Sequence, residues 1–157
     1  MRASDDTITQ YLTQHPSFDG LDPAQVSLIA SHAQIVHFAP GERLFSRDGD
    51  AREFFIVQDG KVTVGVPSID GESLEIQTVG PGSMLGWSWL IPPYRWSFDA
   101  RAVTPTSVIA VDGAKLREAC EVDLKLGYEL MKRFALLMAK RLNAARMAAI
   151  RQHASGI

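Results

Sequence analysis

Five aromatic side chains gather in a short stretch of this chain, and the stretch contains every tryptophan of its 157 residues. They are Trp87, Trp89, Tyr94, Trp96 and Phe98. Aromatic faces stack on planar apolar groups and attract cations, and an arginine beside them can pair with an anion. The segment therefore indicates recognition chemistry. Within it, Arg95 is either an anion anchor or a surface arginine stacked on a ring.

Catalytic and metal-binding patterns are weak by comparison. A metal site on a β-barrel needs several histidines aimed at one centre, often as His-x-His. The four histidines, of which only His37 falls on an expected strand, are His15, His32, His37 and His153. The sequence contains no nucleophile elbow, Cys-x-x-Cys pair or phosphate-binding Gly-Lys loop. We therefore predict no enzyme, no metal and no certain cofactor, with Cys120 as a small buried or half-buried residue rather than a reactive thiol.

The composition is that of an ordinary globular protein with a formal net charge of −2. A single cysteine allows no internal disulfide, which fits a reducing compartment. The first residues do not form a secretory signal, and no apolar run has the roughly 18 residues of a membrane span. We expect a cytoplasmic location and no membrane contact. Residues 130–157 carry six basic residues and no acid, so they form a solvated basic face or contact an acidic partner or nucleic acid.

Two helices are expected before any strand, over residues 5–14 and 22–33. The second begins with Asp22 as cap, Pro23 at the first position and Gln25 completing a capping box. Seven short runs, several alternating apolar and polar residues, are then typical of strands. They are Gln34–Phe38, Arg43–Phe45, Glu53–Gln58, Lys61–Val66, Ser73–Val79, Ser97–Val103 and Thr106–Val111. Asp59-Gly60 predicts a two-residue hairpin, and the set predicts a jelly-roll β-barrel.

Helical periodicity returns after residue 112, with a short helix over Ala114–Ala119 and a long one over Val122–Gln152. The long helix carries two adjacent apolar stripes. The first contains Leu124, Met131, Phe134, Ala135, Met138, Leu142, Ala145 and Ala149, and the second Leu126, Leu130 and Leu137. One stripe can pack on the barrel. The extra width predicts either a homodimer through this helix or a deep groove in its own barrel.

Four motifs in this order resemble the cyclic-nucleotide-binding domain of catabolite-activator-like regulators and kinase regulatory subunits. They are PSFDGL at 16–21, FAPGERLF at 38–45, FFIVQDGKV at 54–62 and VGPGSMLG at 79–86. The resemblance implies one domain over 1–157 that is mainly β with helices, in which 18–112 form a helix and the jelly-roll barrel. Residues 113–152 would then form the C-terminal helices.

The resemblance also implies a phosphate-binding cassette that opens at Gly86. In the family an acid follows this glycine and holds the ribose, and an arginine nine or ten residues later pairs with the phosphate. Here Trp87 replaces the acid, and an ungapped alignment puts Trp96 at the arginine position, beside Arg95. The ligand-binding residues expected on this basis are Gly86, Trp87, Ser88, Trp89, Arg95, Trp96 and Ser97. Cyclic AMP or cyclic GMP is the ligand that the family implies, but ribose recognition has lost its acceptor.

Three interpretations of the tryptophans follow: a pocket retuned for an apolar, aromatic or cationic ligand, rings that fill a ligand-free barrel, or an exposed patch for a protein partner. The leading hypothesis is a non-catalytic regulatory or sensor domain in signal transduction that binds a non-standard small molecule. The alternatives are a ligand-free oligomerisation or docking module and a part of a transcription regulator. The chain ends at Ile157 without room for a recognition helix, so no autonomous DNA binding is expected.

Overall fold

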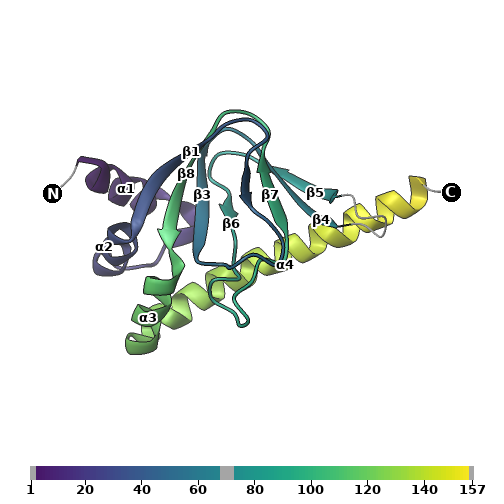
Figure 1. The fold of residues 1–157 in the computed structure, drawn as a ribbon. Coiled ribbons are helices and arrows are strands. Elements are labelled where there is room, and N and C mark those ends of the chain that lie inside the picture. The colour runs from purple at the N-terminus through teal and green to yellow at the C-terminus, as the bar shows by residue number, and fades with distance from the viewer. Residues whose placement is uncertain (1–2, 68–72, 156–157) are drawn as a thin grey trace.

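The computed structural model describes residues 3–67 and 73–155. Helices lie at both ends of this range, with all of the strands between them (Figure 1). The helices are α1 (Ala3–Gln14), η1 (Pro16–Phe18), α2 (Pro23–Ser31), α3 (Gly113–Val122) and α4 (Leu124–Ser155). The strands are β1 (Ala33–Phe38), β2 (Arg43–Phe45), β3 (Glu53–Asp59), β4 (Val62–Pro67), β5 (Ser73–Val79), β6 (Met84–Leu85), β7 (Asp99–Ala102) and β8 (Thr106–Asp112).

The strands form two antiparallel sheets, in the orders β1-β8-β3-β6 and β2-β7-β4-β5. The predicted jelly-roll barrel with N-terminal helices and a long C-terminal helix is therefore confirmed. The helix α4 passes beneath both sheets, and its last turns extend past β4 and β5 (Figure 1).

The central strand β3 separates two apolar clusters. Phe54 and Ile56 face the cluster that the helices cover, whereas Phe55 and Val57 face the interior between the sheets. Successive side chains of a strand point to opposite faces, so both faces of β3 are buried. This explains why Phe54–Val57 is a continuous apolar run rather than an alternating one.

The predicted hairpin at Asp59-Gly60 is wrong. Its two strands belong to different sheets, because β3 pairs with β8 and β6 while β4 pairs with β5 and β7. Gly60 has φ +100°, and a Cβ there would lie 2.6 Å from the carbonyl oxygen of Pro105 and also against Thr106. The glycine is thus required by a crossing between sheets that brings another loop close.

The two C-terminal helices are separate elements that break at Asp123. The short helix runs on to Val122, and the carboxylate of Asp123 then accepts a hydrogen bond from the amide of Leu126, 3.1 Å away. The capping box of Asp22 and Gln25 at the start of α2 is confirmed. The sequence did not reveal β6 or η1.

The two apolar stripes of α4 have different environments. Leu126, Leu130 and Leu137 of the second stripe are buried, together with Phe134 of the first. By contrast, Leu124 and Leu142 are 75% and 72% exposed. The second stripe is therefore the one that packs on the barrel, and most of the first lies on the surface.

Candidate functional site

The aromatic segment between β6 and β7 lines a slot against the interior of the barrel. The slot is bounded by Phe45, Val64, Leu85, Gly86, Trp87, Ser88, Trp96, Ser97, Phe98 and Arg141. Five of the seven predicted ligand-binding residues meet there: Gly86, Trp87, Ser88, Trp96 and Ser97. Residues 86–98, between β6 and β7, are called the cassette segment below. Residues of this segment, β2, β4 and α4 thus converge at one place.

The indole of Trp96 occupies this slot. It is only 6% exposed and stacks on Phe45, with the ring centroids 3.9 Å apart and the planes inclined by 15°. The space that remains is about 10 Å³, which is no more than about one water molecule needs. In this conformation a ligand larger than water has room only if the indole moves.

Gly86 is required by the close approach of that indole. A Cβ at this position would lie 2.6 Å from Cζ3 of Trp96, well inside van der Waals contact. The backbone of Gly86 also has φ +94°, a conformation that side chains rarely adopt. Gly86, the predicted first residue of the cassette, therefore leaves the space that the Trp96 indole occupies.

The rim of the slot is aromatic and contains no carboxylate. Trp87, which the sequence resemblance predicts to replace the family's ribose acid, makes an edge-to-face contact with Phe98 at 5.1 Å and 78°. Two hydroxyl groups also line the slot, the buried one of Ser88 and the exposed one of Ser97. The rim suits planar apolar groups better than a ribose.

Trp89 does not line the slot but lies in the core beneath it. It is 0% exposed, and its ring centroid lies 5.4 Å from that of Phe54 and 5.2 Å from that of Phe134 on α4. A Cβ at Gly113 would lie 2.7 Å from the Cβ of Trp89. Trp89 therefore packs the cassette segment against the face of the sheet that the helices cover.

Arg95 also lies outside the slot. Its guanidinium donates a 2.9 Å hydrogen bond to the carbonyl of Asp48 and lies 3.8 Å from the carboxylate of Asp50. The side chain is 56% exposed. The structure thus places the predicted anion anchor on the surface, beside the turn at residues 48–50.

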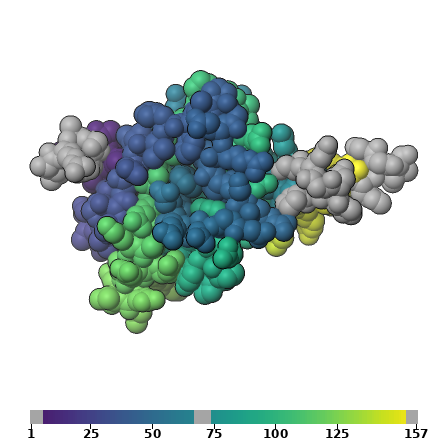
Figure 2. Space-filling view, viewed as in Figure 1, coloured from purple at the N-terminus to yellow at the C-terminus, as the bar shows by residue number. Residues whose placement is uncertain are grey.

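A second arginine joins the cassette segment to α3. Arg117 donates a hydrogen bond to the carbonyl of Trp89, and its guanidinium carbon lies 3.9 Å from the ring centroid of Tyr94. Figure 2 shows α3 and this segment next to one another at one end of the barrel. Both C-terminal helices therefore contact the cassette directly.

Sequence reasoning missed Arg141, which is buried at 4% exposure. Its guanidinium donates to the side-chain oxygen of Gln77 at 2.9 Å and to the carbonyl of Met84 at 2.8 Å. Burial lowers its pKa. A signal was available, because position 141 continues the helical spacing of the buried Leu130, Phe134 and Leu137.

The family model of the cyclic nucleotide-binding domain matches residues 35–123, more than half of the chain. The chain belongs to this family. A crystal structure of a protein of Geobacter metallireducens GS-15, named for cyclic nucleotide binding, superposes with a TM-score of 0.77. The two are 29% identical, and the match covers 90% of this chain and 99% of that one.

Curated relatives of this cyclic nucleotide-binding domain are longer proteins. The CRP-like cAMP-activated global transcriptional regulator of Mycobacterium tuberculosis is 25% identical over 100 residues, which are 64% of this chain and 45% of the relative. The cyclic AMP receptor protein of Thermus thermophilus is 28% identical over 96 residues, which are 61% and 44%. The match thus spans less than half of each relative.

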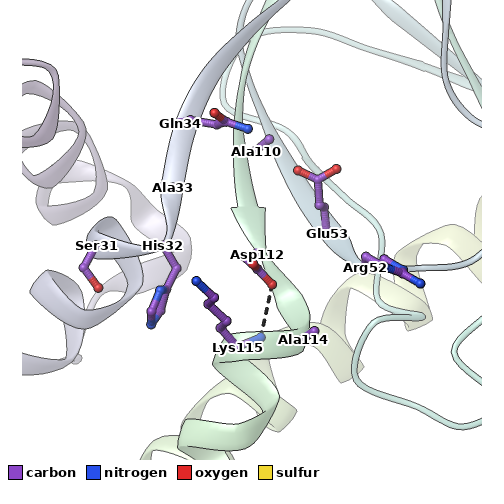
Figure 3. Close-up of a pocket in the computed structure, with 10 residues that line it drawn as sticks. All are labelled: Ser31, His32, Ala33, Gln34, Arg52, Glu53, Ala110, Asp112, Ala114 and Lys115. Carbon is purple, nitrogen blue, oxygen red and sulfur yellow. Dashed lines mark hydrogen bonds between the residues drawn. The ribbon is translucent and has the colours of Figure 1, made fainter.

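The domain also has a larger polar cleft, of about 540 Å³, at the junction of α2, β1, β3 and α3 (Figure 3). Its charged lining side chains have both signs, Glu53 and Asp112 with Arg52 and Lys115, and the Lys115 amine points toward the ring of His32. Asp112 accepts a 3.1 Å hydrogen bond from the Lys115 amide as the cap of α3. Burial and then Asp112 raise the pKa of Glu53. No cassette residue lines this cleft.

Within residues 3–67 and 73–155, no group of three or more His, Cys, Asp or Glu is arranged to hold a metal ion. No helix in the same ranges has the length and apolar character needed to cross a membrane. His37 is exposed on β1, and Cys120 is buried, as predicted. Burial and then the charge of Asp123 raise the pKa of Cys120.

Proposed function

We propose that this cyclic nucleotide-binding domain is a non-catalytic sensor module, in which the aromatic slot receives a small molecule and α4 transmits the result. The observation that carries this proposal is the Trp96 indole, which fills the slot and stacks on Phe45 with no covalent or ionic bond to hold it there. Its family supports a regulatory role, because the Mycobacterium tuberculosis relative is a cAMP-activated global transcriptional regulator and the Thermus thermophilus relative is a cyclic AMP receptor protein. Residues 1–157 act as one unit in this proposal.

The link from the slot to α4 is made by packing. Trp89 lies two residues beyond Trp87 and contacts Phe134 of α4 edge to face, with the ring planes inclined by 81°. Arg117 of α3 holds the carbonyl of the same Trp89. A ligand that displaces Trp96 shifts the cassette, and the shift reaches both helices through these contacts. Ligand binding then changes the relative populations of two packings.

The surface of α4 on which such a change would act is a largely exposed seam, which is suited to contact with a second copy of the chain. Apolar residues recur at alternating spacings of four and three, as in positions a and d of a coiled coil. The seam consists of Leu124, Tyr128, Met131, Ala135, Met138, Leu142, Ala145 and Ala149. Two of these, Met138 and Ala145, are half-buried, and Ala145 also packs against the apolar cluster between the sheets. Tyr128 is 63% exposed and Leu142 is 72% exposed. A helix seam of this period is self-complementary, so a homodimer with paired α4 helices is the natural assembly.

A ligand-free docking module is the second candidate function. The nearly complete filling of the slot, which leaves about 10 Å³, favours it. In that case Trp96 is a permanent core residue, and the seam on α4 is the only functional surface proposed. The name of the Mycobacterium tuberculosis relative raises a role in transcription, which predicts salt-dependent DNA binding by the basic part of α4.

The first experiment combines tryptophan fluorescence, thermal shift and light scattering on the purified protein. The probes are cyclic AMP, cyclic GMP and a panel of small organic anions, cations and neutral aromatic compounds. A sensor shows a saturable emission change together with stabilisation of about 2.7 kcal/mol at 100 times the dissociation constant. A dimer that ignores every probe supports the docking module. A monomer that ignores every probe contradicts both functions.

A further inference from the structure

Arg141 is a buried cation whose charge no described residue balances. Its side chain is 4% exposed, and no carboxylate in the ranges 3–67 and 73–155 forms an ion pair with it. Both of its hydrogen-bond acceptors, the Gln77 side chain and the Met84 carbonyl, are neutral. Buried charges in proteins are normally paired, because an unpaired one is strongly unfavourable. The position of Arg141 therefore suits a bound anion.

The guanidinium has donors left for such an anion. A guanidinium carries five N–H groups, and the two hydrogen bonds of Arg141 to described residues occupy two of them. The remaining three are sufficient for a planar carboxylate, which a guanidinium binds with two parallel hydrogen bonds. Arg133 is by contrast paired with Glu129, one helical turn before it on α4, at 2.6 Å.

The surroundings of Arg141 define the rest of the ligand. The slot that it lines is walled by aromatic rings, by apolar side chains and by the hydroxyls of Ser88 and Ser97. The indole of Trp96 already fills it with a flat apolar body stacked on Phe45. A planar apolar group of similar or smaller size can take the same place. No carboxylate among the lining residues would repel a negative charge.

We propose that the slot binds a small planar carboxylate, aromatic or otherwise apolar, whose body replaces the Trp96 indole and whose carboxylate pairs with Arg141. This inference rests on the proposed function, since it assumes that the slot is the sensing site. It assigns the anion contact to α4 itself rather than to the cassette. The ligand then touches the helix that carries the dimer seam, so binding and response share one element.

The same geometry disfavours a phosphate monoester, which carries about −1.5 to −2 charges at pH 7. A single buried guanidinium balances one negative charge, and the second candidate cation, Arg95, is held outside the slot by Asp48. Pro92 and Pro93 have no amide protons to offer a phosphate. A monoanion with a flat apolar body is the ligand class that satisfies the charge, the shape and the donors together.

The test compares acids with their neutral amides by isothermal calorimetry on the full chain. The acids are benzoate, phenylacetate and indole-3-acetate, and the controls are benzamide, phenylacetamide and indole-3-acetamide. We expect each acid to bind at least about tenfold more tightly than its amide, because only the acid forms the charge-assisted pair. In Trp96→Ala, where the indole no longer competes, we expect every acid to bind at least about tenfold more tightly still.

Two substitutions at Arg141 on α4 test whether its guanidinium is the group that pairs with the carboxylate of the ligand. Arg141→Gln should weaken the acids about tenfold or more without affecting the amides, and Arg141→Lys should retain part of the difference. Lys140→Gln is the matched control, because it removes the same charge from the next, exposed position and should leave the affinities unchanged. If Arg141→Gln does not fold, the difference in affinity between acids and amides in Trp96→Ala is the remaining test of the carboxylate proposal.

The contradicting outcomes are distinct. If the amides, the neutral compounds or a cyclic nucleotide bind as well as the acids, the sensor function stands and the carboxylate proposal fails. If Lys140→Gln weakens the acids as much as Arg141→Gln and Trp96→Ala has no effect, the anion sits in the neighbouring groove of about 300 Å³ that both cations line, and the slot proposal fails. If no probe binds the native chain or Trp96→Ala, both proposals fail.

Discussion

Replacing Gly86 by alanine should expel Trp96 from the slot. The new Cβ would lie 2.6 Å from Cζ3 and 2.8 Å from Cη2 of the indole, too close for either group to stay. The backbone at φ +94° adds a conformational cost of about 1–3 kcal/mol for a residue with a side chain. The loss of indole burial and of stacking on Phe45 adds about 2–4 kcal/mol.

Gly82→Ala is the matched control for this prediction. Gly82 has φ +89°, but nothing lies within 4 Å of its added Cβ. It therefore carries the conformational cost without the collision. Urea denaturation should show Gly86→Ala to be less stable than Gly82→Ala by about 2–4 kcal/mol, which is roughly 2–4 °C in Tm for each kcal/mol at this chain length.

Tryptophan emission gives an independent readout of the same event. Gly86→Ala should shift the emission to the red, because an indole that is 6% exposed moves into water, whereas Gly82→Ala should not. Equal destabilisation by the two variants, with unchanged emission in both, would refute the packing of Trp96 on Gly86. The role of the indole as a displaceable plug would be refuted with it.

Three further predictions concern other parts of the molecule. Leu142→Glu, which places a charge in the α4 seam at a residue that is 72% exposed, should turn a dimer into a folded monomer in light scattering, whereas exposed Lys140→Glu should not. Glu53 has a raised pKa, so its proton is held more tightly in the folded state and its contribution to stability is lost as pH rises. Glu53→Gln should accordingly stabilise the protein at pH 7, and the gain should disappear below about pH 4, as urea midpoints across pH will show. Cys120, buried and with a raised pKa, should react with a thiol reagent at pH 8 only as fast as the protein unfolds, so rapid labelling without denaturant would contradict its burial.

Local features of the chain were predictable where the cause lies within a few residues. The capping box of Asp22 and Gln25 depends on contacts between positions three apart, and it is present. The strands follow from their apolar patterns because each must bury at least one face. The four spaced motifs implied the family, since turns that need glycine recur at fixed separations.

Partnerships between distant segments were harder to predict. Asp59-Gly60 has the composition of a hairpin, yet the chain crosses there to the other sheet, because β8 and β7 are the better-placed neighbours of β3 and β4. Strand order depends on long-range packing, which a dipeptide does not encode. Similarly, the two stripes of α4 were visible in the sequence, but the choice of stripe for the barrel depended on the shape of the surface it meets.

The sequence by itself determined that the chain is a β-barrel with flanking helices, and that a tryptophan rather than an acid follows Gly86 in a segment rich in aromatic residues. These are properties of residue type and spacing along the chain. Only the tertiary structure decided that Trp96 fills the slot, that Arg95 turns to the surface, and that Arg141 enters the interior from α4. Each of these outcomes depends on which side chains meet across more than forty residues of chain, and such meetings are fixed by packing and by the balance of buried charge.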